Sequence, residues 1–558
     1  MTIDPIVLEV LRHRFFAIAE EMGAALIRTS YSTNIKDRRD ASCALFDRRG
    51  ETIAQAEHIP IHLGVLPWGV KGALQHIDVD ALQPGDAILH NDPFIGGTHT
   101  PDLIIFVPIF FEDQLVAFAG NLAHHIDIGG MVPGSLSPQA TEIFQEGLRF
   151  PPVKIRKAGV LDEEILAIHR HNVRTAYEGQ GDLLSQIASN NVGERRFVEM
   201  CEEFGPETVL EGISALADYC DRRMQAELRA IPDGTYSFMD VMDSDGISDE
   251  PVEICVQIDV TGDRLRFDFT GSSPQTRGPV NAVRPMTLSS VYYTVKAITD
   301  STIPPNSGTF RRLDVFTPEG TVVNARFPAP TGQGNSITCQ RIVDVLLGAF
   351  AQAVPDRVCA ACTGSMNGMH IGGFDQETQQ YFSHIETYGG GYGATGHGDG
   401  ESGVHTHMTN TRNAPVEVIE SVLPVKVESY TLVPDSEGPG QYRGGFGIRR
   451  IFRIEADQIH STTSTDRTLA GPWGLAGGQP AQGPQHRVIR ANGEEMKLPA
   501  KAAFELNTGD RLIVETAGGG GWGDVNQREP KAVQADLNEG LISVERAQQI
   551  YGMDHAKE

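Results

Sequence analysis

Two apolar runs with a short polar break between them constrain the fold of this chain more than any other feature. The runs cover residues 103–111 and 115–123, and the break is Glu112-Asp113-Gln114. Each run is shorter than an ordinary helix, and a polar break of this length is typical of a tight turn between strands. The sequence therefore predicts an antiparallel β-hairpin centred near Asp113.

Histidine and aspartate residues flank this predicted hairpin on both sides. Residues 90–130 contain four histidines, and three aspartates besides the one in the turn. Residues at equal distances from the hairpin centre lie opposite each other, so Asp102 should face His124. His99 comes one short turn before Asp102, after a Gly-Gly pair that lets the backbone fold back. The pattern therefore predicts that two imidazoles and one carboxylate converge at the open end of the hairpin.

Two imidazoles and one carboxylate form the ligand set of a metal site with open coordination positions. Such sites are typical of catalytic rather than purely structural metals, and Zn²⁺, Mn²⁺ and Fe²⁺ all accept these donors. We therefore predict a divalent metal on His99, Asp102 and His124. The alternative is that these groups only hydrogen-bond one another at a polar hairpin end.

Three further residues of this segment are candidate catalytic groups. Asp92 precedes the hairpin, whereas His125 and Asp127 follow it. Successive side chains of a strand point to opposite faces, so His125 should point away from His124 and support the ligands from the other face. We rank these residues, together with His90, after the three predicted ligands.

The charge of the chain excludes several classes of partner. Its 558 residues include 46 Lys and Arg against 73 Asp and Glu, which gives a net charge of −27. Contacts to phosphates need clustered cations, so neither nucleic acid nor an anionic membrane is an expected partner. The longest apolar run, residues 103–111, is far below the roughly 20 residues of a spanning helix, and the N-terminus lacks a signal-peptide pattern. We expect a soluble, cytoplasmic protein.

Seven cysteines are scattered along the chain, an odd number that does not suit a secreted disulfide scaffold. We expect them to be reduced. Cys359 and Cys362 form a CxxC motif, and without a second pair they cannot complete a four-cysteine zinc site. We interpret them as buried packing residues, and a redox role is the alternative.

Two polar segments leave their roles open. Asp399, His405 and His407 lie in a glycine-rich loop, and the spacing of the two histidines places both on one face if the segment is extended. They could form a second site, bring polar groups to the first, or bond only to the backbone. The charged run 36–40 is either a solvated loop or a site for a substrate anion.

The chain is longer than one hydrophobic core usually serves, so we expect several lobes. Periodic apolar positions predict helices in much of the first 232 residues, and alternating runs from residue 234 predict an antiparallel sheet. The predicted fold class is α+β, with mixed or antiparallel sheets, flanking helices and a β-rich C-terminal part. The predicted parts are an N-terminal α+β domain with the hairpin (1–232), a central α+β domain (233–422), a glycine-rich β domain (423–525) and a C-terminal helical tail (526–558).

The sequence carries no motif for binding nucleotides or for serine nucleophiles. It has no Gly-Lys-Ser/Thr phosphate loop, no G-x-S-x-G elbow and no H-E-x-x-H zinc motif. Residues 391–396 match G-x-G-x-x-G, but the residues after them do not have the pattern of a helix, so the dinucleotide fingerprint lacks its context. We therefore do not expect the chain alone to bind ATP.

Six ordered segments together resemble the hydantoinase B/oxoprolinase family, and they span almost the whole chain. The segments are NIKDRRDASCALFD (34–47), HIPIHLGVLPWGV (58–70), GDAILHNDPFIGGTHTPD (85–102), GNLAHHIDIGG (120–130), HTHMTNTRNAPVEVIE (405–420) and TAGGGGWGD (516–524). This family provides a subunit of ATP-dependent hydantoinases and lactamases, the second half of 5-oxoprolinases, and a subunit of acetone-type carboxylases.

The resemblance implies a metal-binding catalytic subunit that works with a hydantoinase A-like ATP-binding subunit in a hetero-oligomer. In carboxylase relatives, a His-x-x-Asp pair and a later histidine hold a divalent metal, and these map onto His99, Asp102 and His124. The partner would phosphorylate a small-molecule substrate, and this subunit would act on the intermediate, with Asp92 or His125 to orient ligands or take a proton.

The reaction that the resemblance favours is hydrolysis of a cyclic amide such as a hydantoin, a lactam or 5-oxoproline. The alternative is ATP-dependent carboxylation of a ketone of the acetone or acetophenone type. Carboxylase versions of this subunit are longer than this chain, which favours the hydrolase.

Overall fold

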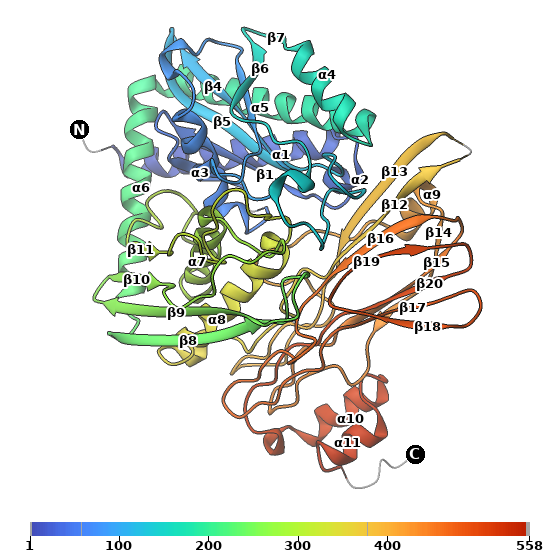
Figure 1. Ribbon diagram of the computed structural model, residues 1–558. Helices are drawn as coiled ribbons and strands as arrows, with labels where there is room; N and C mark the ends of the chain where they lie inside the picture. Colours follow the sequence, from blue (N-terminus) through green and yellow to red (C-terminus); the bar gives the residue numbers. More distant parts are fainter. Residues whose placement is uncertain (1–2, 57, 377, 554–558) are drawn as a thin grey trace.

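The computed structural model of the protein describes residues 3–56, 58–376 and 378–553. These residues form an α+β fold with four sheets, in which most neighbouring strands are antiparallel (Figure 1). The predicted fold class is therefore confirmed. The first helix, α1 (Pro5–Thr29), begins where the sequence predicts, because the Asp4 carboxylate accepts hydrogen bonds from the first free backbone N–H groups.

The predicted hairpin lies in the middle of the N-terminal sheet. Its strands are β4 (Asp102–Phe111) and β5 (Gln114–His124), and Asp102 pairs with His124 as predicted. The sheet has the order β2-β1-β5-β4-β3-β6-β7. The remaining strands are β1 (Ala41–Asp47), β2 (Thr52–Gln55), β3 (Ala87–His90), β6 (Val153–Lys157) and β7 (Val160–Leu161).

A tight turn and a bulge together set the register of this hairpin. Glu112 and Asp113 both have positive φ, 47° and 63°, as a two-residue type I′ turn requires. The register shifts beside Val116, where β5 has one residue more than β4. Without that extra residue Asp102 would pair with Ala123, and the His124 side chain would miss the carboxylate.

Helices cover both faces of the N-terminal sheet. Helices α1 and α5 (Ala176–Phe204) pack on one face, and α3 (His62–Leu74) packs on the other. The hairpin strands are apolar without alternation because neither of their faces meets water. Two short helices, α2 (Thr33–Lys36) and α4 (Glu163–Asn172), complete this part.

The central part shares one continuous hydrophobic core with the N-terminal part. Its sheet has the order β11-β10-β9-β8, and α8 packs on β8 and β9 while α6 runs along the outside (Figure 1). A single π-helical turn, Gly334–Thr338, leads directly into α8. The elements are α6 (Pro206–Leu228), β8 (Gly234–Met242), β9 (Val252–Thr261), β10 (Arg264–Asp268), α7 (Arg284–Ile298), β11 (Leu313–Phe316) and α8 (Cys339–Phe350).

The β-rich part has its own core and two sheets, with orders β13-β12-β16-β19 and β14-β15-β20-β17-β18. Its first two strands, β12 and β13, precede residue 423, and β12 pairs with β16. The predicted division into four parts stays a prediction. The elements are β12 (Gly368–Asp375), β13 (Gln380–Thr387), α9 (Val416–Val422), β14 (Val425–Leu432), β15 (Ile448–Ile454), β16 (Ile459–Ser464), β17 (Gln485–Ile489), β18 (Glu495–Leu498), β19 (Lys501–Leu506) and β20 (Arg511–Glu515).

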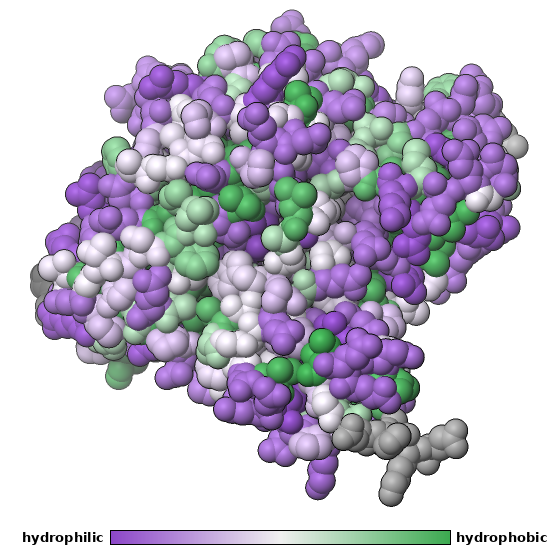
Figure 2. All heavy atoms as spheres, turned by 60° about the horizontal axis from the view of Figure 1, so that its bottom comes forward, coloured by the Kyte–Doolittle hydropathy of each residue, from purple (hydrophilic) through white to green (hydrophobic). Residues whose placement is uncertain are grey.

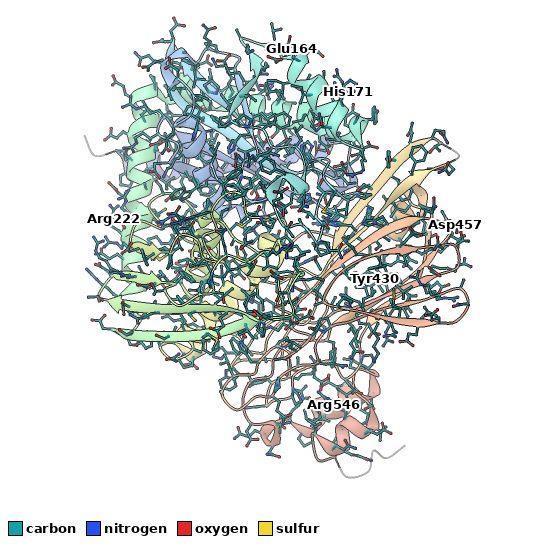
Figure 3. The ribbon with its side chains drawn as sticks, in the orientation of Figure 1. Glu164, His171, Arg222, Tyr430, Asp457 and Arg546 are labelled. Atoms are coloured by element: carbon teal, nitrogen blue, oxygen red, sulfur yellow. The ribbon has the colours of Figure 1, made fainter. Side chains whose placement is uncertain are left out.

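Two short helices, α10 (Pro530–Asn538) and α11 (Val544–Gln549), form the predicted helical tail. Arg546, labelled in Figure 3, donates a hydrogen bond from Nε to the buried carboxylate of Glu437 at 2.9 Å. A small hydrophobic cluster joins the same helices to Phe446. The tail is therefore docked on the loops of the β-rich part.

The face of the molecule seen in Figure 2 is largely hydrophilic, and its hydrophobic side chains gather only in small groups. This pattern agrees with the excess of acidic residues in the sequence. Within the described ranges, no helix has the length and apolar character needed to cross a membrane.

Candidate metal centre

The open end of the β4–β5 hairpin brings three potential metal ligands together. His99, Asp102 and His124 each offer one ligand atom, these atoms lie within 4.8 Å of one another, and all three residues are buried. The two imidazole rings meet edge to face with their centroids 5.0 Å apart. The structure therefore shows the predicted convergence, whereas metal binding itself stays a prediction.

The carboxylate of Asp102 is held by three neighbours. Its Oδ2 accepts hydrogen bonds from the Thr98 hydroxyl and from Asn335 Nδ2, the latter at 3.1 Å, and lies 3.2 Å from His99 Nε2. Burial alone would raise the pKa of Asp102, but the neighbouring His99 holds it well below its usual range. The group is therefore ionised, as a metal ligand must be.

His99 is oriented by a loop of the central part. Its Nδ1 donates a hydrogen bond to the Gly332 carbonyl at 3.0 Å, which turns Nε2 toward Asp102. Among the described residues Nε2 has no partner in hydrogen-bond geometry. Burial lowers the pKa of His99, but the charge of Asp102 outweighs it and raises the pKa. A buried imidazole nitrogen held in this way is suited to a metal.

Glu146 supports the loop that orients His99. Its two carboxylate oxygens accept hydrogen bonds from the backbone N–H groups of Gly332 and Thr331, at 2.8 and 3.1 Å. Burial raises the pKa of Glu146 to about 7, although these hydrogen bonds oppose the shift. Glu146 is therefore a positioning residue for the first histidine.

His124 is oriented by Asn34. The Asn34 amide nitrogen lies 3.2 Å from Nδ1 of His124 and donates a hydrogen bond to its backbone carbonyl at 2.7 Å. Burial lowers the pKa of His124 well below the ordinary value, so the imidazole is neutral. Two imidazoles and a carboxylate, each supported through its other atoms, fit a divalent metal with open positions.

A cavity of about 60 Å³ lies beside the three ligands. Residues of the hairpin end, of the turn before α8 and of strands β12, β13 and β16 contribute to its wall. A cavity of this size holds a few water molecules, whereas ligand sites usually exceed about 300 Å³. A ligand larger than a few water molecules therefore enters only if part of the wall moves. Other residues of the wall are Asp40, His62, Gln333, Asn335, His370, Thr409, Thr411 and Ser464.

Three further titratable residues line this wall: Asp40, which belongs to the charged run 36–40, and His62 and His370, which the sequence analysis does not propose as site residues. Burial raises the pKa of Asp40 to about 6, although the charge of Arg38 opposes the shift. Burial lowers the pKa of His62 to about 4 and that of His370 to about 3. A prediction that β1 pairs with β5 would have placed Asp40 near His124, because β1 begins at the residue after Asp40.

The charged run 36–40 is divided between solvent and the protein interior, since Lys36 and Arg39 are exposed whereas Asp40 is half-buried beside the cavity. Arg38 is completely buried, and its guanidinium donates hydrogen bonds to the Ile385 carbonyl at 2.8 Å and the Thr387 hydroxyl at 2.9 Å. These contacts fasten the N-terminal part to β13. Of the two open alternatives, the structure excludes solvation of Arg38, and both of its terminal nitrogens donate to groups of the protein.

The comparison with known proteins identifies the family. The sequence matches the hydantoinase B/oxoprolinase family over residues 4–525. This chain belongs to that family. It is 39% identical to an uncharacterized protein of Methanocaldococcus jannaschii over 98% of this chain and 96% of that protein. It is 33% identical to the caprolactamase subunit beta of Pseudomonas jessenii over 99% of this chain and 96% of that subunit.

Two solved structures share the fold of this hydantoinase B/oxoprolinase family protein. The ATP-dependent caprolactamase of Pseudomonas jessenii superposes with a TM-score of 0.91 and 31% identity, over 100% of this chain and 98% of the matched one. An acetone carboxylase superposes with a TM-score of 0.93 but 21% identity, over 100% of this chain and 80% of the matched one. The second likeness shows the fold alone.

The three candidate catalytic residues of this family member have other contacts. Asp92 lies 3.3 Å from Nε of Arg149, and Asp127 lies 3.0 Å from Nη1 of Arg174. Nε2 of His125 lies 3.0 Å from Gln186 on α5, on the opposite side of the strand from His124, as the alternation predicts. Among the described residues of the cavity wall, none of the three occurs. Their catalytic roles stay predictions.

The polar loop near residue 400 is divided between different neighbours. Asp399 accepts hydrogen bonds from Arg528 at 2.7 and 2.9 Å, close to the helical tail. His407 has a φ of 50°, so the segment is not the extended strand that a shared face of His405 and His407 requires. The ring of His407 lies instead with Cys359 and Cys362.

Proposed function

We propose that this chain is the metal-binding catalytic subunit of an ATP-dependent cyclic amide hydrolase, of hydantoinase, lactamase or 5-oxoprolinase type. The observation that carries the proposal is the buried cluster of His99, Asp102 and His124 beside a cavity, in a chain of the hydantoinase B/oxoprolinase family. The likeness to a caprolactamase subunit over nearly the full chain supports a lactam-type substrate.

His99, Asp102 and His124 would hold the metal. A divalent ion bound there supplies Lewis-acid polarisation of an oxygen atom and lowers the pKa of water. Thr98 and Asn335 fix the orientation of the Asp102 carboxylate. These contacts keep the three donors converged before substrate arrives, so that binding does not have to order them.

Asp40 is the residue that we assign to proton transfer in the cavity. Its half-buried carboxyl belongs to the wall of the cavity that the three ligands also line. From there it can accept a proton from water that adds to the substrate, or return one to the ring nitrogen when the C–N bond breaks. The enclosed cavity also limits the number of competing water molecules.

ATP chemistry belongs to a partner subunit in this proposal, because the chain carries no phosphate loop. An amide resists water since resonance stabilises its carbonyl group, and phosphorylation of the amide oxygen removes that stabilisation. The partner is a hydantoinase A-like subunit, and this chain receives the activated ring. The term subunit in the caprolactamase name supports a heteromeric assembly.

The second candidate function is ATP-dependent carboxylation of a ketone. The likeness to an acetone carboxylase is a shared fold, which is compatible with this reaction but does not select it. A carboxylase must also exclude water from a reactive enolate and retain CO₂. We assign no segment of this chain to that additional task, and we place the hydrolase first.

The test is an isotope experiment on the complex of this chain with its ATP-binding partner. The complex is assayed with ATP against hydantoins, lactams, 5-oxoproline and ketones, in H₂¹⁸O and with ¹³C-bicarbonate. We expect ring opening, with ¹⁸O in the product carboxylate and no ¹³C in the product. Product that carries carbon from bicarbonate would establish the carboxylase instead.

A further inference from the structure

A second cluster of metal-ligating side chains lies away from the hairpin end. Cys359, Cys362 and His407 each offer one ligand atom, these atoms lie within 4.8 Å of one another, and all three residues are buried. Among the described residues that line the hairpin cavity, none of these three occurs. The cluster is therefore a separate site and not an extension of the first.

The donors of this cluster come from two loops that are distant in the sequence. The CxxC pair lies between α8 and β12, and His407 lies between β13 and α9. A CxxC pair is a frequent half of a zinc site, and the missing half is supplied here by a single distant histidine. Both cysteines are free thiols in the structure.

The atoms around these donors are arranged as they are around bound metals. Sγ of Cys362 accepts a hydrogen bond from the Gly393 backbone N–H at 3.2 Å. Nδ1 of His407 lies 3.4 Å from the Tyr293 hydroxyl, which leaves Nε2 for a ligand. Among the described residues Nε2 has no partner in hydrogen-bond geometry, and an oxygen of Asp344 lies at ion-pair distance from it. A metal-bound histidine is usually held in this way through its other nitrogen.

A carboxylate stands beside the cluster. Oδ1 of Asp344, on α8, lies 3.4 Å from Nε2 of His407 and accepts a hydrogen bond from the Cys362 backbone N–H at 3.4 Å. Its Oδ2 is bound by Arg467 at 2.5 Å. Asp344 therefore has one oxygen directed at the cluster and the other fixed by a guanidinium.

The charges near the cluster leave a role for a cation. The ion pairs that include Asp344 form a buried network in which each carboxylate has at least one cationic partner. That network supplies no surplus positive charge, so two thiolates in this buried site would need a divalent ion to balance them. Its members are Arg341, Arg467 and Lys501 with Asp240, Asp344 and Asp466.

We propose that Cys359, Cys362 and His407 bind a structural zinc ion, with Asp344 as a further oxygen donor beside them. Thiolate ligands select zinc over the harder Mg²⁺ and Mn²⁺, and the burial of all three donors suits a structural role. The ion joins the loop after α8 to the segment that begins at His407. That segment continues to Thr409 and Thr411, two residues of the first cavity wall.

The test begins with the full-length wild-type protein and uses cobalt as the probe. Protein is stripped of metal, reconstituted with Co²⁺, and examined for the intense near-ultraviolet absorption that thiolate-to-Co²⁺ charge transfer produces. The first site offers only nitrogen and oxygen, so it cannot give this absorption. In zinc-loaded protein, X-ray absorption should show sulfur at about 2.3 Å from zinc.

Three variants locate the site. The double variant Cys359→Ser/Cys362→Ser should lose the thiolate absorption, whereas Asp102→Ala should retain it. Cys201→Ser is the matched control, since Cys201 is also a buried free thiol but lies on α5, outside the cluster. If the double variant does not fold, the wild-type cobalt and zinc spectra decide the question alone.

Two results would overturn the proposal. The first is wild-type protein that takes up Co²⁺ or Zn²⁺ without any metal–sulfur signal. The second is a Cys359–Cys362 disulfide, found by mass spectrometry after the thiols of freshly prepared protein are blocked. Neither readout depends on catalysis, so failure of the zinc proposal is distinguishable from failure of the proposed function.

Discussion

The two ligand clusters of this molecule are built in different ways. His99, Asp102 and His124 belong to one hairpin and the loop before it, and the pairing of β4 with β5 sets their distance. Cys359, Cys362 and His407 come from loops on either side of the β12–β13 pair, and no strand register joins them. The first cluster is fixed by local pairing, whereas the second needs the β-rich part to fold onto α8.

This difference decides which cluster the sequence can reveal. In a hairpin, the position of the turn determines which residues are opposed, and the alternation of side chains determines which face they share. The distance between two hairpin side chains can therefore be predicted from the sequence. Loops give no such rule. The CxxC motif alone predicts buried packing residues or a redox pair, and nothing in the sequence places His407 beside it.

The strongest test of the first cluster is Asp102→Ala. We expect loss of the metal and of ring-opening activity, because the variant removes one of the three donors and its charge. Lewis-acid stabilisation of several kcal/mol corresponds to a loss of about 10³-fold or more. Elemental analysis and steady-state assays of the complex measure the two effects. Metal content equal to that of wild type would reject the assigned ligand.

Replacement of Asp40 by Asn should keep the metal and reduce turnover. The variant preserves the size of the side chain but cannot exchange a proton, and such groups typically contribute about 10²-fold or more. Asp37→Asn is the control, since Asp37 lies in the same charged run but not among the described residues of the cavity wall. Equal turnover for the two variants would remove Asp40 from the reaction.

The double variant Cys359→Ser/Cys362→Ser tests how much the second cluster contributes to activity. We expect turnover to fall by about ten-fold, less than for Asp102→Ala, because the second site would act only through the segment that carries Thr409 and Thr411 to the cavity. Thermal unfolding should move to lower temperature in the same variant. A loss as large as that of Asp102→Ala, with the first metal retained, would show that the second cluster belongs to the chemistry.

The sequence predicts the hairpin and its ligands but not the rest of the cavity wall. Asp102 and His124 are opposed, as predicted, because the extra residue at Val116 offsets the one-residue shift that the two-residue turn introduces. His62 and His370 come from α3 and β12, and only tertiary packing brings them to the same cavity. Asp40 lies between these two cases, since its place in the wall could have been predicted if the pairing of β1 with β5 had been predicted.

The pH dependence of stability tests whether Glu146 is buried as the structure shows. Its pKa of about 7 lies above that of an exposed glutamate, so the protonated form favours folding. Its contribution to stability is complete below the unfolded pKa of about 4.3 and is lost as the pH rises through about 7. Metal-free wild type should therefore lose stability relative to Glu146→Gln between about pH 4 and about pH 7. Parallel unfolding curves over that range would contradict this burial.

The smallest effect is expected for His125→Gln, a variant of the residue next to His124. The structure directs His125 toward Gln186 on α5, so its ring reaches the metal ligands only through the shared strand. We expect metal affinity to fall by less than about ten-fold, which is near the lower limit of the effects seen when residues that hydrogen-bond to metal ligands are replaced. The pH profile of turnover should not change, because a glutamine side chain can still bond to Gln186 and no proton donor is lost from the cavity. If turnover falls by about 10²-fold and its pH profile loses a limb, His125 transfers a proton, and the catalytic role predicted from the sequence would replace the positional one.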